Sequence, residues 1–144
     1  MNIRMATQDD IVRCKEIVDK HRNVFGFLSR PIFQDAAERR RLLVALDSNQ
    51  NVLGFVRFNH RVRGTETALY DICVDHGFQG QGIGRALISA LIEECIKVPR
   101  LSIVLRCPEG LPSNDFYQHI GFRQAGIEQG KRRNLVVWRY KIEE

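Results

Sequence analysis

The chain has 144 residues, of which 44% are hydrophobic and 27% are charged, and its formal net charge at pH 7 is +5. This length and composition predict a single globular domain with its own core, and they exclude a low-complexity or disordered chain. The longest apolar runs, such as LLVAL and LVVW, are too short to cross a membrane, and no secretion signal is expected, so we expect a cytoplasmic protein. The basic balance suits a polyanionic cofactor, an acidic partner or nucleic acid, and charge alone does not choose among them.

Neither the cysteines nor the histidines have the spacing of a metal site. No two cysteines form a C-x-x-C pair, and each lies within an apolar pattern, which predicts reduced core thiols at Cys14, Cys73, Cys95 and Cys107. We therefore expect no metal and no disulfide framework.

Two helices are predicted in the first forty residues. Thr7 and Asp10 have the form of a capping box, so a first helix is expected from about residue 8 into the twenties, where Gly26 and Pro31 interrupt it. The segment QDAAERR predicts a second, short helix over about 34–40, because it contains good helix formers and no β-branched residue.

Three sequential strands are predicted next. The segment RLLVALDSNQNVLGFVRFNH indicates two strands joined by a turn at Ser48 to Asn51, and TALYDICVD indicates a third over about 66–75. Alternation along the third strand predicts Tyr70, Ile72 and Val74 on one face and Asp71, Cys73 and Asp75 on the other.

A longer helix is predicted from Gly82 to the residue before Pro99, because Ile83, Leu87, Leu91 and Cys95 form an apolar row. The strand RLSIVLRC follows, and the order strand, helix, strand predicts a parallel pair in a mixed sheet. A short helix closed by Gly121 and a last strand, NLVVWRYKI, complete the chain, for which we expect one domain, 1–144.

The glycines between the third strand and the long helix favour a phosphate-binding turn, since glycine lets an anion approach unpaired N–H groups at a helix start. A nucleotide P-loop would need a Lys and a Ser or Thr that are absent here. A dinucleotide loop would need a third glycine where Arg85 stands. A glycine-rich start made only for tight packing remains an alternative.

Gln79, Gly82 and Gly84 match the pattern Q/R-x-x-G-x-G/A, and NDFYQHIGF follows one strand later as residues 114–122. In this combination the chain resembles the GNAT-type acetyl-CoA-dependent N-acetyltransferases. The resemblance implies an α/β fold with a mixed sheet of about six to seven strands, about four flanking helices, and parallel strands that splay apart before and after the long helix.

The resemblance also implies where acetyl-CoA binds. Main-chain N–H groups hold its pyrophosphate, and they come from Gln79, Gly80, Gln81, Gly82, Ile83, Gly84 and Arg85. The pantetheine arm contacts the main chain of Ile72, Cys73 and Val74. Many members have an asparagine where this chain has Gly110, and Asn114 is expected to replace it. Tyr117 is also expected to contact the coenzyme, at its sulfur.

Acetyl transfer to an amine requires a proton donor for the departing thiolate and a proton acceptor for the amine. Tyr117 matches the family's general acid, and a phenol of ordinary pKa about 10 can protonate a thiolate. Asp71 is the predicted base, with Glu66, Tyr70, His60 or a water relay as alternatives.

The function predicted from these motifs is transfer of an acetyl group to a primary amine of a small molecule, peptide or protein. The alternatives are a catalytically silent acyl-CoA-binding module and an enzyme that acetylates aminoacyl-tRNA. The basic clusters ERRR and GKRRN are interpreted as solvated faces, so nucleic acid is not the expected partner. Homodimers are common in the family, and the motifs leave the oligomeric state open.

Overall fold

The computed structural model describes residues 1–142. Its strands are β1 (Asn2–Met5), β2 (Leu42–Leu46), β3 (Val52–His60), β4 (Glu66–Val74), β5 (Ser102–Pro108), β6 (Arg123–Glu128) and β7 (Leu135–Lys141). They form a seven-stranded sheet in the order β1-β2-β3-β4-β5-β7-β6. Because β4 and β5 run parallel while β5 and β7 run antiparallel, the sheet is mixed, as the sequence predicts.

The α-helices of the described residues are α1 (Ile11–Asp19), α2 (Arg22–Phe25), α3 (Arg30–Glu38), α4 (Ile83–Lys97) and α5 (Ser113–His119). Two 3-10 turns, Gln8–Asp10 and His76–Phe78, precede α1 and α4. The chain divides into two compact units. The first comprises Met1–Phe58 and Asp71–Leu91, and the second comprises Asn59–Tyr70 and the residues from Ile92 onward.

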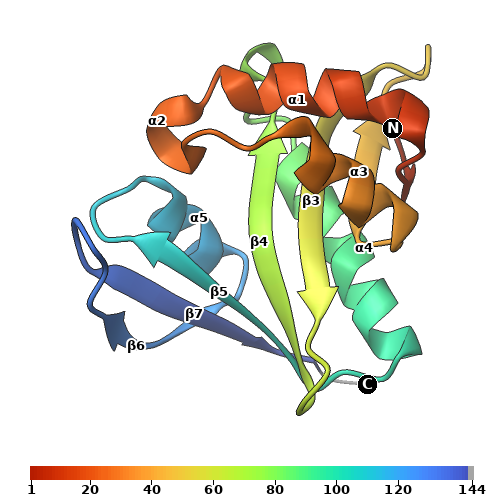
Figure 1. Ribbon diagram of the computed structural model, residues 1–144. Helices are drawn as coiled ribbons and strands as arrows, with labels where there is room; N and C mark the ends of the chain where they lie inside the picture. Colours follow the sequence, from red (N-terminus) through yellow and green to blue (C-terminus); the bar gives the residue numbers. More distant parts are fainter. Residues whose placement is uncertain (143–144) are drawn as a thin grey trace. The chain divides into compact units, whose positions relative to one another are not determined.

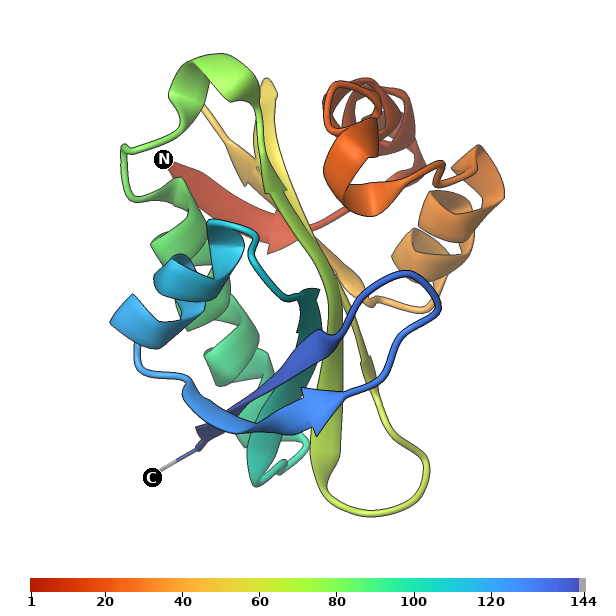
Figure 2. The same ribbon diagram turned by 90° about the vertical axis from the view of Figure 1, so that its left-hand side faces the viewer.

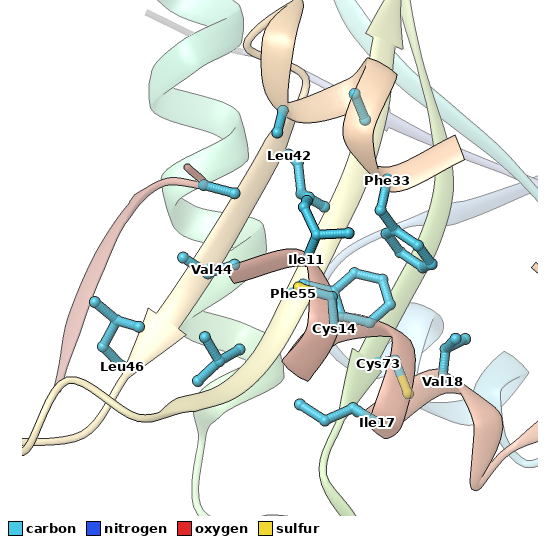
Figure 3. Close-up of a cluster of buried hydrophobic side chains, with 14 residues drawn as sticks. Ile11, Cys14, Ile17, Val18, Phe33, Leu42, Val44, Leu46, Phe55 and Cys73 are labelled. Carbon is cyan, nitrogen blue, oxygen red and sulfur yellow. The ribbon is translucent and has the colours of Figure 1, made fainter. Parts of the chain in front are cut away.

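The core of the first unit lies between helices α1 and α3 and the strands β2 and β3. In Figures 1 and 2 these two helices cover one face of the strands, and the first turns of α4 lie on the other face. Ile11, Ile17 and Val18 of α1 pack with Phe33 of α3 and Phe55 of β3 (Figure 3), and the rings of Phe33 and Phe55 meet edge to face at 5.2 Å. Burial of these apolar side chains is the main stabilising term for the unit.

In the second unit, β7 is hydrogen-bonded along its whole length to β5, from Ser102–Lys141 to Pro108–Leu135. The other edge of β7 pairs with β6, and the two form a hairpin beside β5 (Figure 2). Gly121, with φ 108°, follows α5 and turns the chain toward β6, as a C-terminal glycine should.

The predictions for the first forty residues were partly wrong. The first helix ends at Asp19 instead of the twenties, and α2 is a separate turn of helix. Pro31 lies in the first turn of α3, so it starts a helix instead of interrupting one, because a residue there needs no N–H for the helix ladder. Strand β1 was not predicted, and it exists only by pairing with β2, from Asn2–Leu46 to Met5–Leu43.

Other predictions were confirmed. The strands β2 and β3 are antiparallel and join through 47–51, where the Asp47 carboxylate accepts hydrogen bonds from the N–H groups of Asn49 and Asn51 at 2.8 and 2.9 Å. The four cysteines are buried and unbridged. On β4, Asp71 and Cys73 are buried while Tyr70 is half exposed, which is the predicted alternation.

Candidate functional site

The turn between β4 and α4 leads into the first main-chain N–H groups of a 15-residue helix. Gly80 and Gly82 have φ values of 79° and 84°, a region that favours glycine, and no atom lies within 4 Å of the position that a Cβ would take at either. At the helix start, the Ala86 N–H donates to the Gly82 carbonyl at 3.0 Å. The N–H groups just before Ala86 therefore have no helix carbonyl within reach, and they can bind an anion.

Two side chains hold this turn in place. The Gln79 amide donates to the carbonyl of Val74 at 3.3 Å, which links the turn to the end of β4. Directly after β4, the Asp75 carboxylate accepts from the N–H of His76 at 3.0 Å and from Arg13 at 2.6 Å and Lys20 at 3.0 Å. Burial alone would raise the pKa of Asp75, but the hydrogen bonds from Lys20 and Arg13 outweigh it and lower the pKa.

The main-chain N–H and C=O groups at the end of β4 point alternately toward β3 and toward the opposite edge of the strand. The Asp75 N–H donates to the Leu53 carbonyl of β3 at 2.8 Å, and a Cβ on Gly54 would meet the Cys73 carbonyl at 2.8 Å. Successive residues of a strand direct their N–H and C=O groups to opposite edges. The main-chain groups of Cys73 and Asp75 thus face β3, whereas those of Ile72 and Val74 face the other edge.

The side chain of Cys73 belongs to the core next to Cys14 (Figure 3). Burial, reinforced by the nearby carboxylates of Asp71 and Asp75, raises the pKa of Cys73 to about 12. Burial likewise raises the pKa of Cys14 to about 12. Both thiols are thus protonated at neutral pH and are poor nucleophiles.

The parallel pairing of β4 with β5 is short. It joins Glu66–Ala68 to Ser102–Val104, while β4 continues to Val74 and β5 continues to Pro108. Among the described residues, β5 keeps β7 as its partner after Val104 and pairs no further with β4. The strands that the resemblance expects to splay thus share a ladder of only three residue pairs.

The candidate base Asp71 is paired with a cation of β3. Its carboxylate accepts a hydrogen bond from Arg57 Nε at 2.6 Å, and both side chains are largely buried. Burial raises the pKa of Asp71, and the charge of Arg57 offsets part of that rise. A raised pKa suits a base, but the ion pair also gives Asp71 a structural role.

The alternative bases lie in the second unit. Glu66 accepts from Arg139 at 2.9 Å and from Ser102 at 3.3 Å, so its carboxylate is engaged between neighbouring strands. His60 Nδ1 lies 2.6 Å from the hydroxyl of Thr67, and His60 is only 8% exposed. Tyr70 is half exposed on β4.

The residues of the second motif are held by α5. Tyr117 is 7% exposed, and its ring packs against Phe116 at 5.5 Å and Phe122 at 5.7 Å. The Asn114 amide donates to the carbonyls of Pro108 and Leu111, both at 3.0 Å, and its oxygen accepts from the indole of Trp138 at 2.8 Å. These bonds give Asn114 an anchoring role for the loop before α5, and its contact with pantetheine stays a prediction.

The predicted site residues fall into two groups. The loop residues Gln79–Arg85, the three residues 72–74 and Asp71 belong to the first unit, whereas Tyr117, Asn114, Glu66, Tyr70 and His60 belong to the second. Sequence reasoning missed Arg13, Lys20 and Arg57. No local pattern marks them, because Arg13 reaches an aspartate 62 residues away.

A cavity of about 1030 Å³ lies in the second unit beside α5 and the β6–β7 hairpin. Its lining includes Asn114, Gln118, Phe122, Ile127 and Trp138. It contains no residue of the glycine turn, so it is not the predicted phosphate site.

Comparison with known proteins agrees with this fold and these motifs. The model of the acetyltransferase (GNAT) family matches residues 8–122. The protein Ard1 of Thermoplasma volcanium superimposes with a TM-score of 0.87 at 20% identity, covering 99% of this chain and 98% of that one. A putative acetyltransferase of Salmonella typhimurium, solved with its cofactor acetyl-CoA, gives 0.81 at 20% identity, with 100% and 95% covered.

The ribosomal-protein-alanine N-acetyltransferase of Brucella melitensis gives a TM-score of 0.81 at 21% identity, with 98% and 99% covered. Since the family model spans most of the chain, this protein belongs to the GNAT family of acetyltransferases. Within the described residues, every helix is too short or too polar to span a bilayer.

Proposed function

We propose that this protein transfers the acetyl group of acetyl-CoA to a primary amine, with residues 1–144 acting as one catalytic domain. The observation that carries the proposal is the exposed turn from Gln79 to Gly82, where two glycines with positive φ and open space at their Cβ positions precede the N–H groups at the start of α4, which have no helix carbonyl to bond. Such a turn fits a diphosphate, since the groups and the helix dipole are already aimed at an anion before it binds.

The remainder of the coenzyme would follow β4. The main-chain groups of Ile72 and Val74 face away from β3, and the ladder between β4 and β5 ends at Ala68 and Val104. A pantetheine arm carries amides that pair with strand main chain, so this stretch offers it donors and acceptors. The Val74 carbonyl already accepts from Gln79, and its N–H is the group proposed for the thioester oxygen.

Acetyl-CoA supplies an activated acyl group, so the chain has only to position the amine and move protons. Tyr117 is proposed to protonate the departing thiolate, because it occupies the tyrosine of the family's second motif. Asp71 is proposed as the base for the amine, directly or through water. Its pKa, raised by burial, is the property that supports this role.

The acceptor is proposed to be the primary amine of a small molecule, a peptide or a protein. Two neighbours in fold support that range: one is a ribosomal-protein-alanine N-acetyltransferase, and another is an N-acetylglutamate synthase solved with coenzyme A and N-acetyl-glutamate. At identities of 21% and 14%, these neighbours indicate a shared fold and not a shared acceptor, so the acceptor has to be identified by experiment.

Calorimetric titration with coenzyme A and with acetyl-CoA tests the first half of the proposal, and thiol release with a panel of amines tests the second. We expect both coenzymes to bind with micromolar affinity or better, and release of thiol to depend on one class of amine. No binding of either coenzyme would overturn the proposal. Binding without turnover for any amine would leave an acyl-CoA-binding module in place of an enzyme.

A further inference from the structure

The Asp75 carboxylate joins the entry of the glycine turn to helix α1. Its Oδ1 accepts from Lys20 Nζ and from the N–H of His76, and its Oδ2 accepts from Arg13. The main chain of Asp75 is fixed as well, because its N–H donates to Leu53 and its carbonyl accepts from the N–H of Phe78 at 2.9 Å. This residue is 6% exposed, whereas the four residues of the glycine turn, Gln79–Gly82, which follow the 3-10 turn His76–Phe78, are exposed.

This arrangement fixes the entry of the turn, where the Gln79 amide adds its hydrogen bond to the Val74 carbonyl. Exposed glycines have many conformations available to them, and their N–H groups must converge on one anion to bind it well. Asp75 removes part of that freedom in advance, since it ties the first residues of the turn to a helix whose apolar face is buried in the core. The cost of ordering the turn is then partly met before the coenzyme arrives.

We infer that Asp75 is a positioning residue for coenzyme binding: it holds the glycine turn against α1 through Arg13 and Lys20, without touching the coenzyme itself. The inference rests on the proposed function, because the turn is taken as the diphosphate site. Because Asp75 joins the Lys20 end of α1 to the turn, occupancy of the diphosphate site stabilises that end of the helix. In return, an ordered helix end strengthens binding at the diphosphate site to the same extent.

The direction in which one substitution changes coenzyme affinity separates positioning from simple electrostatics. Asp75→Asn removes a negative charge near an anion site and releases two cations, so charge alone would tighten coenzyme binding, by up to about twofold at ordinary salt. Loss of positioning would weaken binding, by about 5- to 20-fold if the coupling has the usual size. The two explanations predict opposite directions.

A second variant uses the same logic. Asp75→Glu keeps the charge but lengthens the side chain, so the carboxylate can no longer accept from the His76 N–H and both cations in the present geometry. Electrostatics alone predicts unchanged binding, and positioning predicts a loss of about 5-fold or more.

Asp10 provides a matched control in the same unit. It is also 6% exposed, accepts from the N–H of Thr7 at 2.8 Å and pairs with Arg4 at 2.7 Å, but it lies at the other end of α1. Asp10→Asn should lower thermal stability about as much as Asp75→Asn while leaving coenzyme affinity unchanged. A general loss of stability is thereby distinguished from a loss of positioning.

Lys15 of α1 and Lys20, the residue that caps its C-terminal end, form a second pair for comparison, in case Asp75→Asn does not fold. Lys20 is half exposed and bonds to Asp75, whereas Lys15 pairs with Asp19. Lys20→Gln and Lys15→Gln change the charge equally, yet only Lys20→Gln should weaken coenzyme binding, by about 2- to 5-fold.

The experiment is calorimetric titration of each full-length variant with coenzyme A, together with its thermal unfolding and, once an acceptor is known, kcat and KM for acetyl-CoA. The inference expects a raised dissociation constant for Asp75→Asn and Asp75→Glu, with kcat at saturating coenzyme within about twofold of the parent. Unchanged or tighter binding in Asp75→Asn, or an equal loss in Asp10→Asn, would overturn it. Failure of the unsubstituted protein to bind coenzyme A would instead overturn the proposed function, and the inference with it.

Discussion

Gly82 occupies a backbone conformation that any other residue would adopt at a cost, and Gly64, in the turn between β3 and β4, supplies a control. Their φ values are 84° and 85°, and neither has an atom within 4 Å of a Cβ position. Gly82→Ala and Gly64→Ala should therefore each destabilise the protein by about 1 kcal/mol. Only Gly82→Ala should weaken coenzyme A binding, by about 10-fold, the value of one charge-assisted hydrogen bond. Calorimetry and urea unfolding measure both effects, and equal affinities in the two variants would contradict the prediction.

Tyr117 offers a test of the proposed proton donor. Tyr117→Phe removes only the hydroxyl and keeps the ring that packs on Phe116 and Phe122. We expect kcat to fall by about 100-fold, the usual value of a positioned general acid, while coenzyme affinity stays within about twofold.

The control is Tyr140→Phe, because the ring of Tyr140 packs on the same Phe122 at 5.3 Å. Steady-state kinetics of the two variants should differ strongly. If Tyr117→Phe keeps the full rate across the pH range, Tyr117 is not the acid and serves in packing or sulfur contact.

At the scale of elements, the close approach of β3 and β4 is set by Gly54. A Cβ there would meet the main-chain oxygen of Cys73 at 2.8 Å, and this atom cannot yield without parting the strands. Gly54→Ala should lower the free energy of unfolding by about 1 to 3 kcal/mol. Gly77→Ala, where a Cβ would meet nothing within 4 Å, should change it by less than about 0.5 kcal/mol. Urea unfolding measures the difference, and equal stabilities would show that the strands move apart freely.

The two ends of helix α1 are held by carboxylates whose pKa values are lowered. Asp10 lies at its N-terminal end, and Asp75 binds Lys20 at its C-terminal end. For Asp10, burial alone would raise the pKa, but hydrogen bonds from Arg4 and Thr7 lower it, and Asp75 behaves likewise. A carboxylate with a lowered pKa in the folded state stabilises the fold above its unfolded pKa of about 4. That contribution is lost as the pH falls through the lowered value.

Stability should therefore be steady from neutral pH down to about pH 5 and should fall below about pH 4. The double variant Asp10→Asn, Asp75→Asn should be less stable at pH 7 and should lose less on acidification. Asp71, whose pKa is raised by burial, contributes with the opposite sign, but it is present in both proteins and cancels in the comparison. Parallel pH profiles of the two proteins would contradict the assignment.

At the scale of the whole molecule, the net charge of +5 predicts how binding responds to salt. A few fixed N–H groups contact the anion in the proposed site, so raising ionic strength from about 0.05 to about 0.5 M should weaken coenzyme affinity only about two- to fivefold. A nucleic-acid acceptor would behave differently, because its binding would neutralise several phosphates. Its affinity would then fall by more than about 100-fold over that range of salt. Titrations at several salt concentrations, with coenzyme A and with each acceptor, distinguish the two cases.

Local patterns were sufficient for most elements. The hairpin of β2 and β3, the strand β4 and the helix α4 each carry their own turn residues or apolar periodicity, and each was found near its predicted position. Strand β1 has too few turn residues and too short an apolar pattern to be recognised. Its four residues form a strand only because β2, about forty residues later, lies beside them. Pro31 was misread for a related reason: a proline breaks a helix or begins one depending on the residues that fold around it.

The glycine turn, the apolar helix that follows it and the later tyrosine motif were sufficient, without coordinates, to predict the family and the mixed sheet. They do so because a backbone conformation and a helix period are properties of a few consecutive residues. The partners of Asp75 and Asp71, the edge that each residue of β4 faces, and the point where β4 and β5 cease to pair were decided only by the tertiary structure. Each of these depends on segments distant in sequence being brought together by the core, and no short pattern carries that information.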